Sequence, residues 1–384
     1  FGSRLRALLT STLLPPPFRP SVPSMQPTSR ERQMSRSGCA IAAAPWRRAG
    51  VAWRLSLLAL GALAQPRGAR ADPDGFLVMS TPRDSKISWL RLPENGDFAG
   101  AVPKTLIDTG LKAPQGIAVD KKRRRLYVAD PDAQKIFAYQ LSIVSGRLVA
   151  DSEQITICSG IESRWVAVDG AGTIFFTDEP QNRILKVAAD RAMRGMVTPE
   201  VVYSDAAEIN KPGGLAVDNF HVFWTNKNFG QEAGSLVRGA ESPLSGGAAA
   251  SLSILAKNSV KCYGVCIAMG NVFFTDSEKA IYGVKKDGGV VAEVSGALSR
   301  PRGCAWDGDG TVYVADRGAG AVFSFASNMH VISETTLTKA FEFEDAFGLA
   351  VLNGAARHLF ALPSAVLAAC LALLAAASPG LLEH

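Results

Sequence analysis

Residues 111–130 read LKAPQGIAVDKKRRRLYVAD, and the pattern of this stretch recurs along the chain. The apolar side chains of GIAVD and of LYVAD alternate with other residues at the period of two that a pleated strand requires. Between the two apolar runs lies the polar segment 120–125, which is short enough to form a tight connection. The stretch therefore predicts two antiparallel strands joined by a turn.

The first half of this unit is a core of Gly, an apolar residue, Ala, Val and Asp, and six copies of it follow one another at intervals of 39 to 50 residues. The copies are GIAVD at 116–120, WVAVD at 165–169, GLAVD at 214–218, GVCIA at 264–268, GCAWD at 303–307 and GLAVL at 348–352. Five of them precede a second strand: LYVAD at 126–130, IFFTD at 174–178, VFWTN at 222–226, VFFTD at 272–276 and VYVAD at 312–316. Such a period is typical of a β-propeller, whose blades cannot bury both of their faces alone.

The two ends of the repeat region complement each other. The core at 348–352 has no strands after it, whereas FLVMS at 76–80 and KISWL at 86–90 look like second and third strands without a core before them. Joining the ends gives one complete blade and leaves no exposed radial edge. We therefore expect an all-β fold, a six-bladed β-propeller over 72–352, closed by pairing the C-terminal inner strand with the N-terminal strands.

The repeats resemble those of the NHL and LDL-receptor class B (YWTD) families, which belong with the TolB-like six-bladed propellers. GIAVD followed by LYVAD is similar to the NHL version, and IFFTD, VFWTN and VFFTD are similar to the YWTD version. The resemblance implies the fold but not a function, because the matching residues are mostly those that a blade needs for packing.

The segment before the propeller has the composition of a targeting segment. Residues 1–71 hold eleven Arg, no Lys and a single acid, Glu31, so we expect an unstructured leader at 1–46. At 47–71, the three arginines that precede the apolar run 55–64, the run itself and the Ala-Arg-Ala site at 69–71 form the three parts of a secretory signal peptide. An organelle transit peptide is the alternative.

Removing the leader changes the charge of the chain. The whole sequence has 41 basic and 35 acidic residues, but residues 72–384 have 30 and 34, a net charge of −4. The high isoelectric point therefore does not indicate a nucleic-acid partner. The local basic run KKRRR at 121–125 is interpreted as a solvated turn, with an anionic partner as the alternative.

The C-terminal segment 353–384 contains an uncharged stretch, 359–382, that is long enough to span a bilayer. We expect a membrane anchor, either a GPI signal that uses small residues near 353–356 or a single-pass transmembrane helix. A helix docked on the ring or on a partner is the third possibility. Together with the leader, this segment predicts a protein of the secretory pathway, at the cell surface or on an endomembrane.

The cysteine and histidine residues do not indicate a particular reaction or metal site. The predicted propeller holds Cys158, Cys262, Cys266 and Cys304, which permit two disulfides whose pairing the spacing leaves open. It has only two histidines, so a His-based zinc site is not expected. The aspartates that end the first and second strands recur in nearly every blade, which indicates that they cap turn amides rather than catalyse a reaction.

The residues that lead into the inner strands differ from blade to blade, as a binding site requires. In a propeller these positions converge at the mouth of the central channel. We expect a ligand or partner site formed by Gln115, Arg164, Tyr263, Arg302 and Phe347. Two arginines and an aromatic face suit a carboxylate, a sulfate or an acidic peptide. Alternatively, the arginines pair with neighbouring acids such as Glu162 and Asp307.

Two functions follow from this pattern. The first is a non-catalytic binding module for a protein or glycan partner, without a cofactor or a catalytic residue. The second rests on a resemblance to gluconolactonase-like propellers, which place a Glu, an Asn and an Asp around a divalent metal. That resemblance implies a lactonase or related hydrolase binding Ca²⁺ or Zn²⁺, with Glu162, Asn210, Asp345 or Asp169 as candidate ligands.

Overall fold

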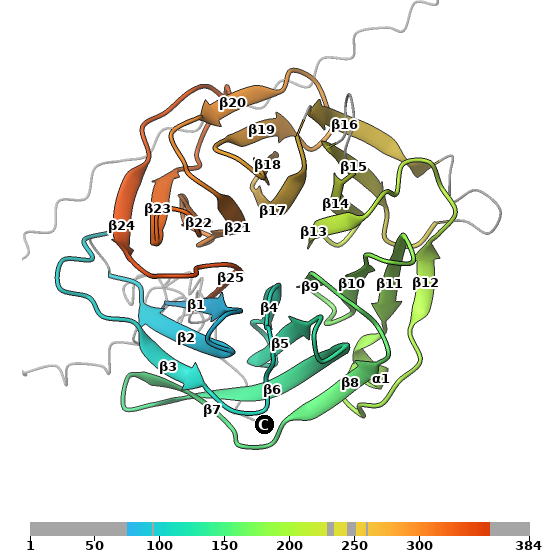
Figure 1. Cartoon of the computed structure of the whole chain (residues 1–384), viewed down its shortest axis with the longest axis vertical. Coiled ribbons are helices and arrows are strands. Elements are labelled where there is room, and N and C mark those ends of the chain that lie inside the picture. The colour runs from blue at the N-terminus through green and yellow to red at the C-terminus, as the bar shows by residue number, and fades with distance from the viewer. Residues whose placement is uncertain (1–74, 94–95, 229–233, 244–250, 259, 354–384) are drawn as a thin grey trace, which may run out of the picture. The chain divides into compact units, whose positions relative to one another are not determined.

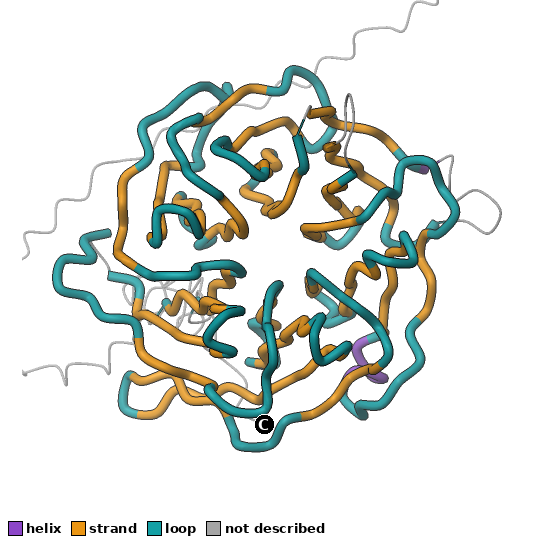
Figure 2. The backbone as a smooth tube through the Cα atoms, in the orientation of Figure 1, coloured by secondary structure: helices purple, strands orange, loops and turns teal. Residues whose placement is uncertain are grey.

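The computed structural model describes residues 75–93, 96–228, 234–243, 251–258 and 260–353. They form six antiparallel sheets arranged around a common axis, the predicted six-bladed propeller (Figure 1). Strands and loops make up almost all of this part of the chain, and α1 (Ala189–Ala192) is its one short helix (Figure 2). The predicted leader, signal peptide and membrane segment lie outside the described residues.

Each blade runs from an inner strand near the axis to an outer strand at the rim. The first blade contains β25 (Leu349–Leu352), β1 (Phe76–Thr81), β2 (Lys86–Arg91) and β3 (Lys104–Ile107). The second contains β4 (Ile117–Asp120), β5 (Arg125–Asp130), β6 (Lys135–Val144) and β8 (Ile155–Ser159), and β7 (Arg147–Ala150) pairs with the far end of β6. The third contains β9 (Val166–Val168), β10 (Ile174–Asp178), β11 (Arg183–Val187) and β12 (Glu200–Tyr203).

The other three blades are regular. They contain β13 (Pro212–Val217), β14 (His221–Lys227), β15 (Gly234–Ala240) and β16 (Ser253–Asn258); β17 (Cys262–Ala268), β18 (Asn271–Asp276), β19 (Ile281–Lys285) and β20 (Ala292–Ser295); and β21 (Pro301–Trp306), β22 (Thr311–Asp316), β23 (Ala321–Ala326) and β24 (Thr338–Glu342).

The ring closes as the sequence predicts. Strand β25 pairs with β1 in antiparallel register, with Phe76 opposite Leu352 and Met79 opposite Leu349. The two ends of the repeat region therefore share one sheet, and the C-terminal strand is its inner strand. Every blade of the described ring therefore has its own inner strand, and no second strand is left as the inner edge of its sheet.

The apolar core is divided among the boundaries between blades. Six clusters of buried side chains are present, one between each pair of neighbouring blades. Side chains of a second strand alternate between two of these clusters: Phe176 packs toward the β4 blade and Phe175 toward the β13 blade. Each strand thus contributes to two interfaces, which explains why a single blade cannot be stable alone.

The repeat aspartates cap turns, as expected. Asp307 Oδ1, for example, accepts hydrogen bonds from the N–H groups of three turn residues, Asp309, Gly310 and Thr311. Asp120, Asp169, Asp218, Asp130, Asp276 and Asp316 also accept backbone N–H groups. Asp178 differs, because the hydrogen bonds that it accepts come from the side chain of Arg183.

Candidate functional site

The five side chains predicted at the channel mouth line one cavity of about 370 Å³. They are Gln115, Arg164, Tyr263, Arg302 and Phe347, and each stands before or near the start of an inner strand. Lys211, which precedes β13, adds the remaining blade. All six blades therefore contribute to this cavity, which places it on the axis of the ring. We call it the mouth cavity; that it binds a ligand remains a prediction.

Further lining residues were not predicted. Glu179, Lys227 and Arg317 each follow the aspartate or asparagine that ends the second-strand repeat, and Asn228 and Lys261 complete the wall. The second strand runs antiparallel to the inner strand, so its end lies beside the start of the inner strand. The position after the repeat aspartate is thus a sequence signal that would have found three of these residues.

The backbone of the mouth cavity is fixed by hydrogen bonds between blades. The Gly264 N–H donates to Thr275 Oγ1 (2.9 Å), and that hydroxyl donates to the Arg302 carbonyl of the next blade (2.6 Å). Ser80 makes the same bridge between the Gly348 N–H (2.8 Å) and the Gln115 carbonyl (2.6 Å). Thr225 bridges to the Tyr263 carbonyl and Thr177 to that of Gly213.

Two blades carry alanine, Ala129 and Ala315, in place of the bridging hydroxyl. There the glycine of the core donates directly, from Gly116 N–H to the Arg164 carbonyl (3.1 Å) and from Gly303 N–H to the Phe347 carbonyl (2.8 Å). Every one of the five predicted site residues is therefore held through its carbonyl by the preceding blade.

This close approach explains the glycine of the repeat. A Cβ atom built on Gly264 would lie 2.1 Å from the Arg302 carbonyl oxygen, and one on Gly348 would lie 2.2 Å from that of Gln115. Both distances are far below van der Waals contact, so the neighbouring blade could dock only at a greater distance. Glycine at the core position thus sets how closely the blades meet at the mouth cavity.

Arg302 is the most unusual charge in the mouth cavity. The residue is 8% exposed, and its guanidinium lies 4.1 Å from the centroid of the Tyr263 ring. Nη1 donates to the Pro301 carbonyl (2.7 Å), whereas Nε is buried without a hydrogen-bond partner. Burial and the nearby Arg317 and Arg300 lower the pKa of Arg302, although a guanidinium keeps its charge. Within the described part of the chain, no carboxylate forms an ion pair with it.

Glu179 neutralises two of the other cations. Its Oε2 accepts from Arg164 Nε (2.6 Å) and Lys227 Nζ (2.7 Å), and Arg164 also pairs with Glu162. Burial opposes ionisation of Glu179, but the attraction of both cations outweighs it and holds its pKa below the ordinary value. Burial, with repulsion from Arg164 and Lys261, lowers the pKa of Lys227 to about 8 despite the attraction of Glu179.

The mouth cavity carries an excess of positive charge. Its lining holds six cationic side chains and one acid, and Arg317 is paired behind the lining with Asp345 (2.5 Å). Three acids, Glu179, Glu162 and Asp345, pair with Arg164, Lys227 and Arg317 of this lining. The expected pairing of Arg164 with Glu162 is present, whereas Arg302 does not pair with Asp307.

The candidate metal ligands do not come together. Glu162 and Asp345 are engaged by arginines, and Asp169 caps the turn at the opposite end of β9. The backbone N–H of Asn210 donates to Asn226 Oδ1 (3.0 Å), which fixes the loop before β13. Across the described residues, no three His, Cys, Asp or Glu side chains are grouped so that they could hold a metal ion.

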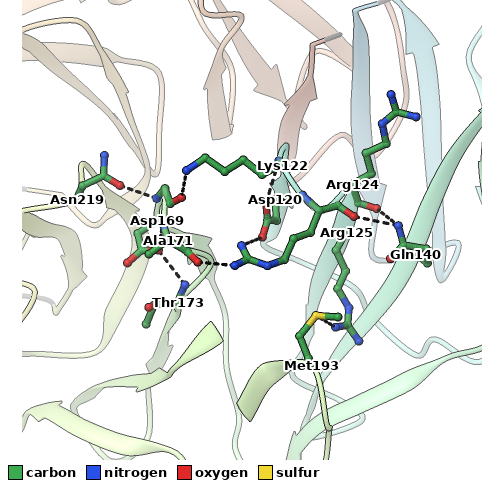
Figure 3. Close-up of polar contacts among 12 residues, drawn as sticks. Asp120, Lys122, Arg124, Arg125, Gln140, Asp169, Ala171, Thr173, Met193 and Asn219 are labelled. Carbon is green, nitrogen blue, oxygen red and sulfur yellow. Dashed lines mark hydrogen bonds and ion pairs between the residues drawn. The ribbon is translucent and has the colours of Figure 1, made fainter. Parts of the chain in front are cut away.

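The basic run at 121–125 lies at the other end of its blade, in the turn between β4 and β5. Lys122 Nζ and Arg123 Nη2 donate to the carbonyls of Gly170 and Ala171 in the next blade, and Arg123 also pairs with Asp120 (Figure 3). Arg125 is only 2% exposed and contacts Met193 Sδ. The run forms the predicted turn, in which Lys121, Lys122 and Arg124 are exposed, and Lys122 and Arg123 in addition join two blades.

One disulfide is present among the described residues. It joins Cys266 on β17 to Cys304 on β21, with the two Cα atoms 5.6 Å apart, so it links two neighbouring inner strands. Cys158 and Cys262 are buried free thiols. Burial raises the pKa of each to about 12, which makes both unreactive as nucleophiles.

Comparison with solved structures supports the fold. A crystal structure of a nidogen/laminin complex matches with a TM-score of 0.57 at 16% identity, over 72% of this chain and 98% of the other. Virginiamycin B lyase from Staphylococcus aureus matches with a TM-score of 0.45 at 15% identity, over 71% of this chain and 84% of the other. At such identities the likeness concerns the fold alone. No family model and no curated protein matches the sequence.

The membrane prediction falls on residues 359–382, which lie outside the described ranges. Within those ranges, no helix has the length and apolar character needed to cross a membrane.

Proposed function

We propose that this propeller is a non-catalytic binding module that captures an acidic segment of a protein partner in its mouth cavity. The observation that carries the proposal is Arg302, a cation that is nine-tenths buried, lines the cavity and has no carboxylate partner among the described residues. A buried charge without a counter-ion is destabilising, so the position is unfavourable for folding alone. An anionic group supplied by a partner removes that penalty.

The surroundings of Arg302 suit a carboxylate in particular. Stacking on Tyr263 fixes the plane of the guanidinium, and the fixed plane favours a planar oxyanion at its edge. The excess of cations in the lining accommodates more than one acid at the mouth cavity. Lys211 and Lys261 extend the cationic lining toward neighbouring acidic residues of the same segment.

The size of the mouth cavity favours a protein over a polymer of sugars. About 370 Å³ is at the small end of ligand sites and accepts one or two side chains. The likeness to the nidogen structure, which was solved in complex with laminin, supports a protein partner for a ring of this shape. A sulfated glycan is the competing anion, and the experiment below separates the two.

The test is fluorescence anisotropy of a labelled hexaglutamate peptide at low salt. Arg302→Met keeps an apolar stem against Tyr263 and removes the charge, so we expect it to weaken binding at least about tenfold. Lys339→Met, which removes an exposed cation on the outer strand β24, serves as the matched control and should leave affinity unchanged. A wild-type protein that does not bind the peptide, or an Arg302→Met variant that binds it with unchanged affinity, contradicts the proposal. Heparin binding without peptide binding assigns the site to a glycan.

The proposal places the protein in the secretory pathway, anchored at a membrane surface. It is supported by the composition of residues 47–71 and 359–382 and by the Cys266–Cys304 disulfide, because such bonds persist in oxidising compartments. Alkylation in intact cells should spare Cys266 and Cys304 until a reductant is added. Equal labelling before and after reduction would contradict this location. Release by phosphoinositide-specific phospholipase would identify a lipid anchor.

A further inference from the structure

A second cavity, of about 600 Å³, lies at the opposite end of the blades from the mouth cavity. Strand β21 extends from one cavity to the other, because it carries Arg302 near its first residue and ends at Trp306, which lines the second cavity. We call this second space the far cavity. Its volume lies within the range of small-molecule sites, and it is formed by turns of the β17 and β21 blades.

Trp306 is a departure from the repeat. The fourth position of the core is Val or Ile in the other five copies, at Val119, Val168, Val217, Ile267 and Val351. The packing of an inner strand therefore requires only a β-branched residue there. The single tryptophan lines the far cavity, and Met269 and Met329 add flexible apolar surface beside it.

Two polar atoms of the lining residues have no hydrogen-bond partner. They are Trp306 Nε1, which can only donate, and Ser327 Oγ, whose residue is completely buried. Buried polar atoms are nearly always paired in native proteins, so two of them at one cavity call for an acceptor from outside the chain. Both groups can donate a hydrogen bond.

Lys285 adds a positive charge to the same lining. Its Nζ donates to Asn271 Oδ1 (2.7 Å) and to the Met329 carbonyl (3.4 Å), both of which are neutral oxygens. Among the described residues it forms no ion pair, and the only acid of the lining, Asp309, is exposed. An ammonium, a hydroxyl and an indole N–H beside apolar surface together favour an anionic oxygen on an apolar body.

We propose that the far cavity binds a small monocarboxylic acid with an aromatic or alkyl body. The carboxylate accepts from Lys285 Nζ, Ser327 Oγ and Trp306 Nε1, and the apolar body packs on the Trp306 ring and the two methionines. This site is separate from the mouth cavity, and the proposal does not depend on the function proposed for that cavity.

The test is isothermal titration of the full chain with naphthylacetate, with octanoate, and with naphthylacetamide as the neutral counterpart of the same shape. The wild type should bind the acids at least about tenfold more tightly than the amide. Lys285→Met should remove this preference while leaving amide binding unchanged. Trp306→Val restores the residue of the sister repeats and should abolish binding of all three probes.

Lys339→Met is the control, because it removes an exposed cation from the outer strand β24 and should leave naphthylacetate binding unchanged. Arg302→Met tests instead whether the acids enter the mouth cavity. Loss of acid binding in Arg302→Met with retention in Lys285→Met would overturn the proposal. So would equal affinity for acid and amide, or no binding of any probe at millimolar concentration. If Trp306→Val does not fold, as judged by circular dichroism, Ser327→Ala replaces it and should weaken the acids more than the amide.

Discussion

Lys227 and Arg302 place their charges near the same aromatic ring, at 5.5 Å and 4.1 Å from the centroid of Tyr263. They differ in what surrounds them, because Lys227 has Glu179 as a partner and no acid in the described ranges pairs with Arg302. They also differ in chemistry, since an ammonium releases its proton when burial is costly and a guanidinium does not. The mouth cavity therefore combines a permanent charge with a titratable one.

Binding of an acidic peptide should weaken as the pH rises through about 8, where Lys227 loses its proton. The folded-state pKa lies below the ordinary lysine value of 10.5, so the residue is charged below pH 8 and neutral above it. An affinity loss of about three- to tenfold between pH 7 and pH 9 is expected from one lost charge. Anisotropy titrations across this range measure it. Lys227→Met should bind more weakly at pH 7 and show no such step; a step that persists in this variant would assign the titration to another group.

The second strands and the inner strands act together as a clamp. A hydroxyl or a glycine N–H from one blade holds the carbonyl that leads into the next, and those carbonyls belong to the residues that line the mouth cavity. Second strands that end in Thr-Asp hold the next blade through the threonine hydroxyl, and in blades whose second strand ends in Ala-Asp the core glycine N–H holds it directly. The clamp keeps the lining backbone rigid, which preorganises the side chains for binding.

Removing one clamp hydroxyl should destabilise the ring. In Thr275→Ala the Gly264 N–H and the Arg302 carbonyl lose a shared partner inside the core, which is expected to cost about 1–3 kcal/mol of unfolding free energy. Thr177→Ala is the matched control, because Thr177 is equally buried but its contacts are longer, at 3.2 and 3.4 Å. Thermal denaturation should show a smaller decrease in Tm for Thr177→Ala. An equal decrease would mean that the loss arises from packing and not from the hydrogen bonds.

The sequence predicted the inner and second strands well because their apolar residues alternate and their spacing repeats. It did not locate the outer strands, such as β3 and β12, since these are short, half exposed and follow connections of unequal length. Likewise, Arg164 and Arg302 were predicted at the mouth from their place before inner strands. Of the two acids that pair with Arg164, Glu162 is two residues away and was predicted, whereas Glu179 follows the second strand and comes beside Arg164 only when β9 and β10 pair. That no described acid pairs with Arg302 depends on the packing around the mouth cavity, which the repeat pattern does not contain.

The ring as a whole depends on one junction between residues far apart in the sequence. Strand β25 contributes Leu349 and Val351 to the cluster shared with the β21 blade, and it pairs with β1 through four residues. Without it, β1 would lose its inner partner and expose its edge. The other blade interfaces join neighbours in sequence and do not replace this one.

Truncation tests the junction directly. A chain that ends after Asn353 keeps β25 and should unfold cooperatively with the Tm of the full chain. A chain that ends after Gly348 lacks β25 and should lose cooperative unfolding, because the ring opens and the apolar cluster between the β21 and β25 blades is exposed. Calorimetry of both proteins measures the difference. Cooperative unfolding at an unchanged Tm in the shorter chain would show that closure is dispensable.

The register of that junction also determines the face of the ring at which the described chain begins and ends. Phe76 pairs with Leu352 at the end of the sheet remote from the mouth cavity, whereas Leu349 lies near it. The chain thus enters and leaves the propeller at adjacent points on one face. A support bound directly at Gly75 or Asn353 would therefore face the end of the ring that carries Trp306 and leave the mouth cavity exposed. A sensor chip coupled at Asn353 of a chain that ends there would display the mouth cavity to a partner in solution.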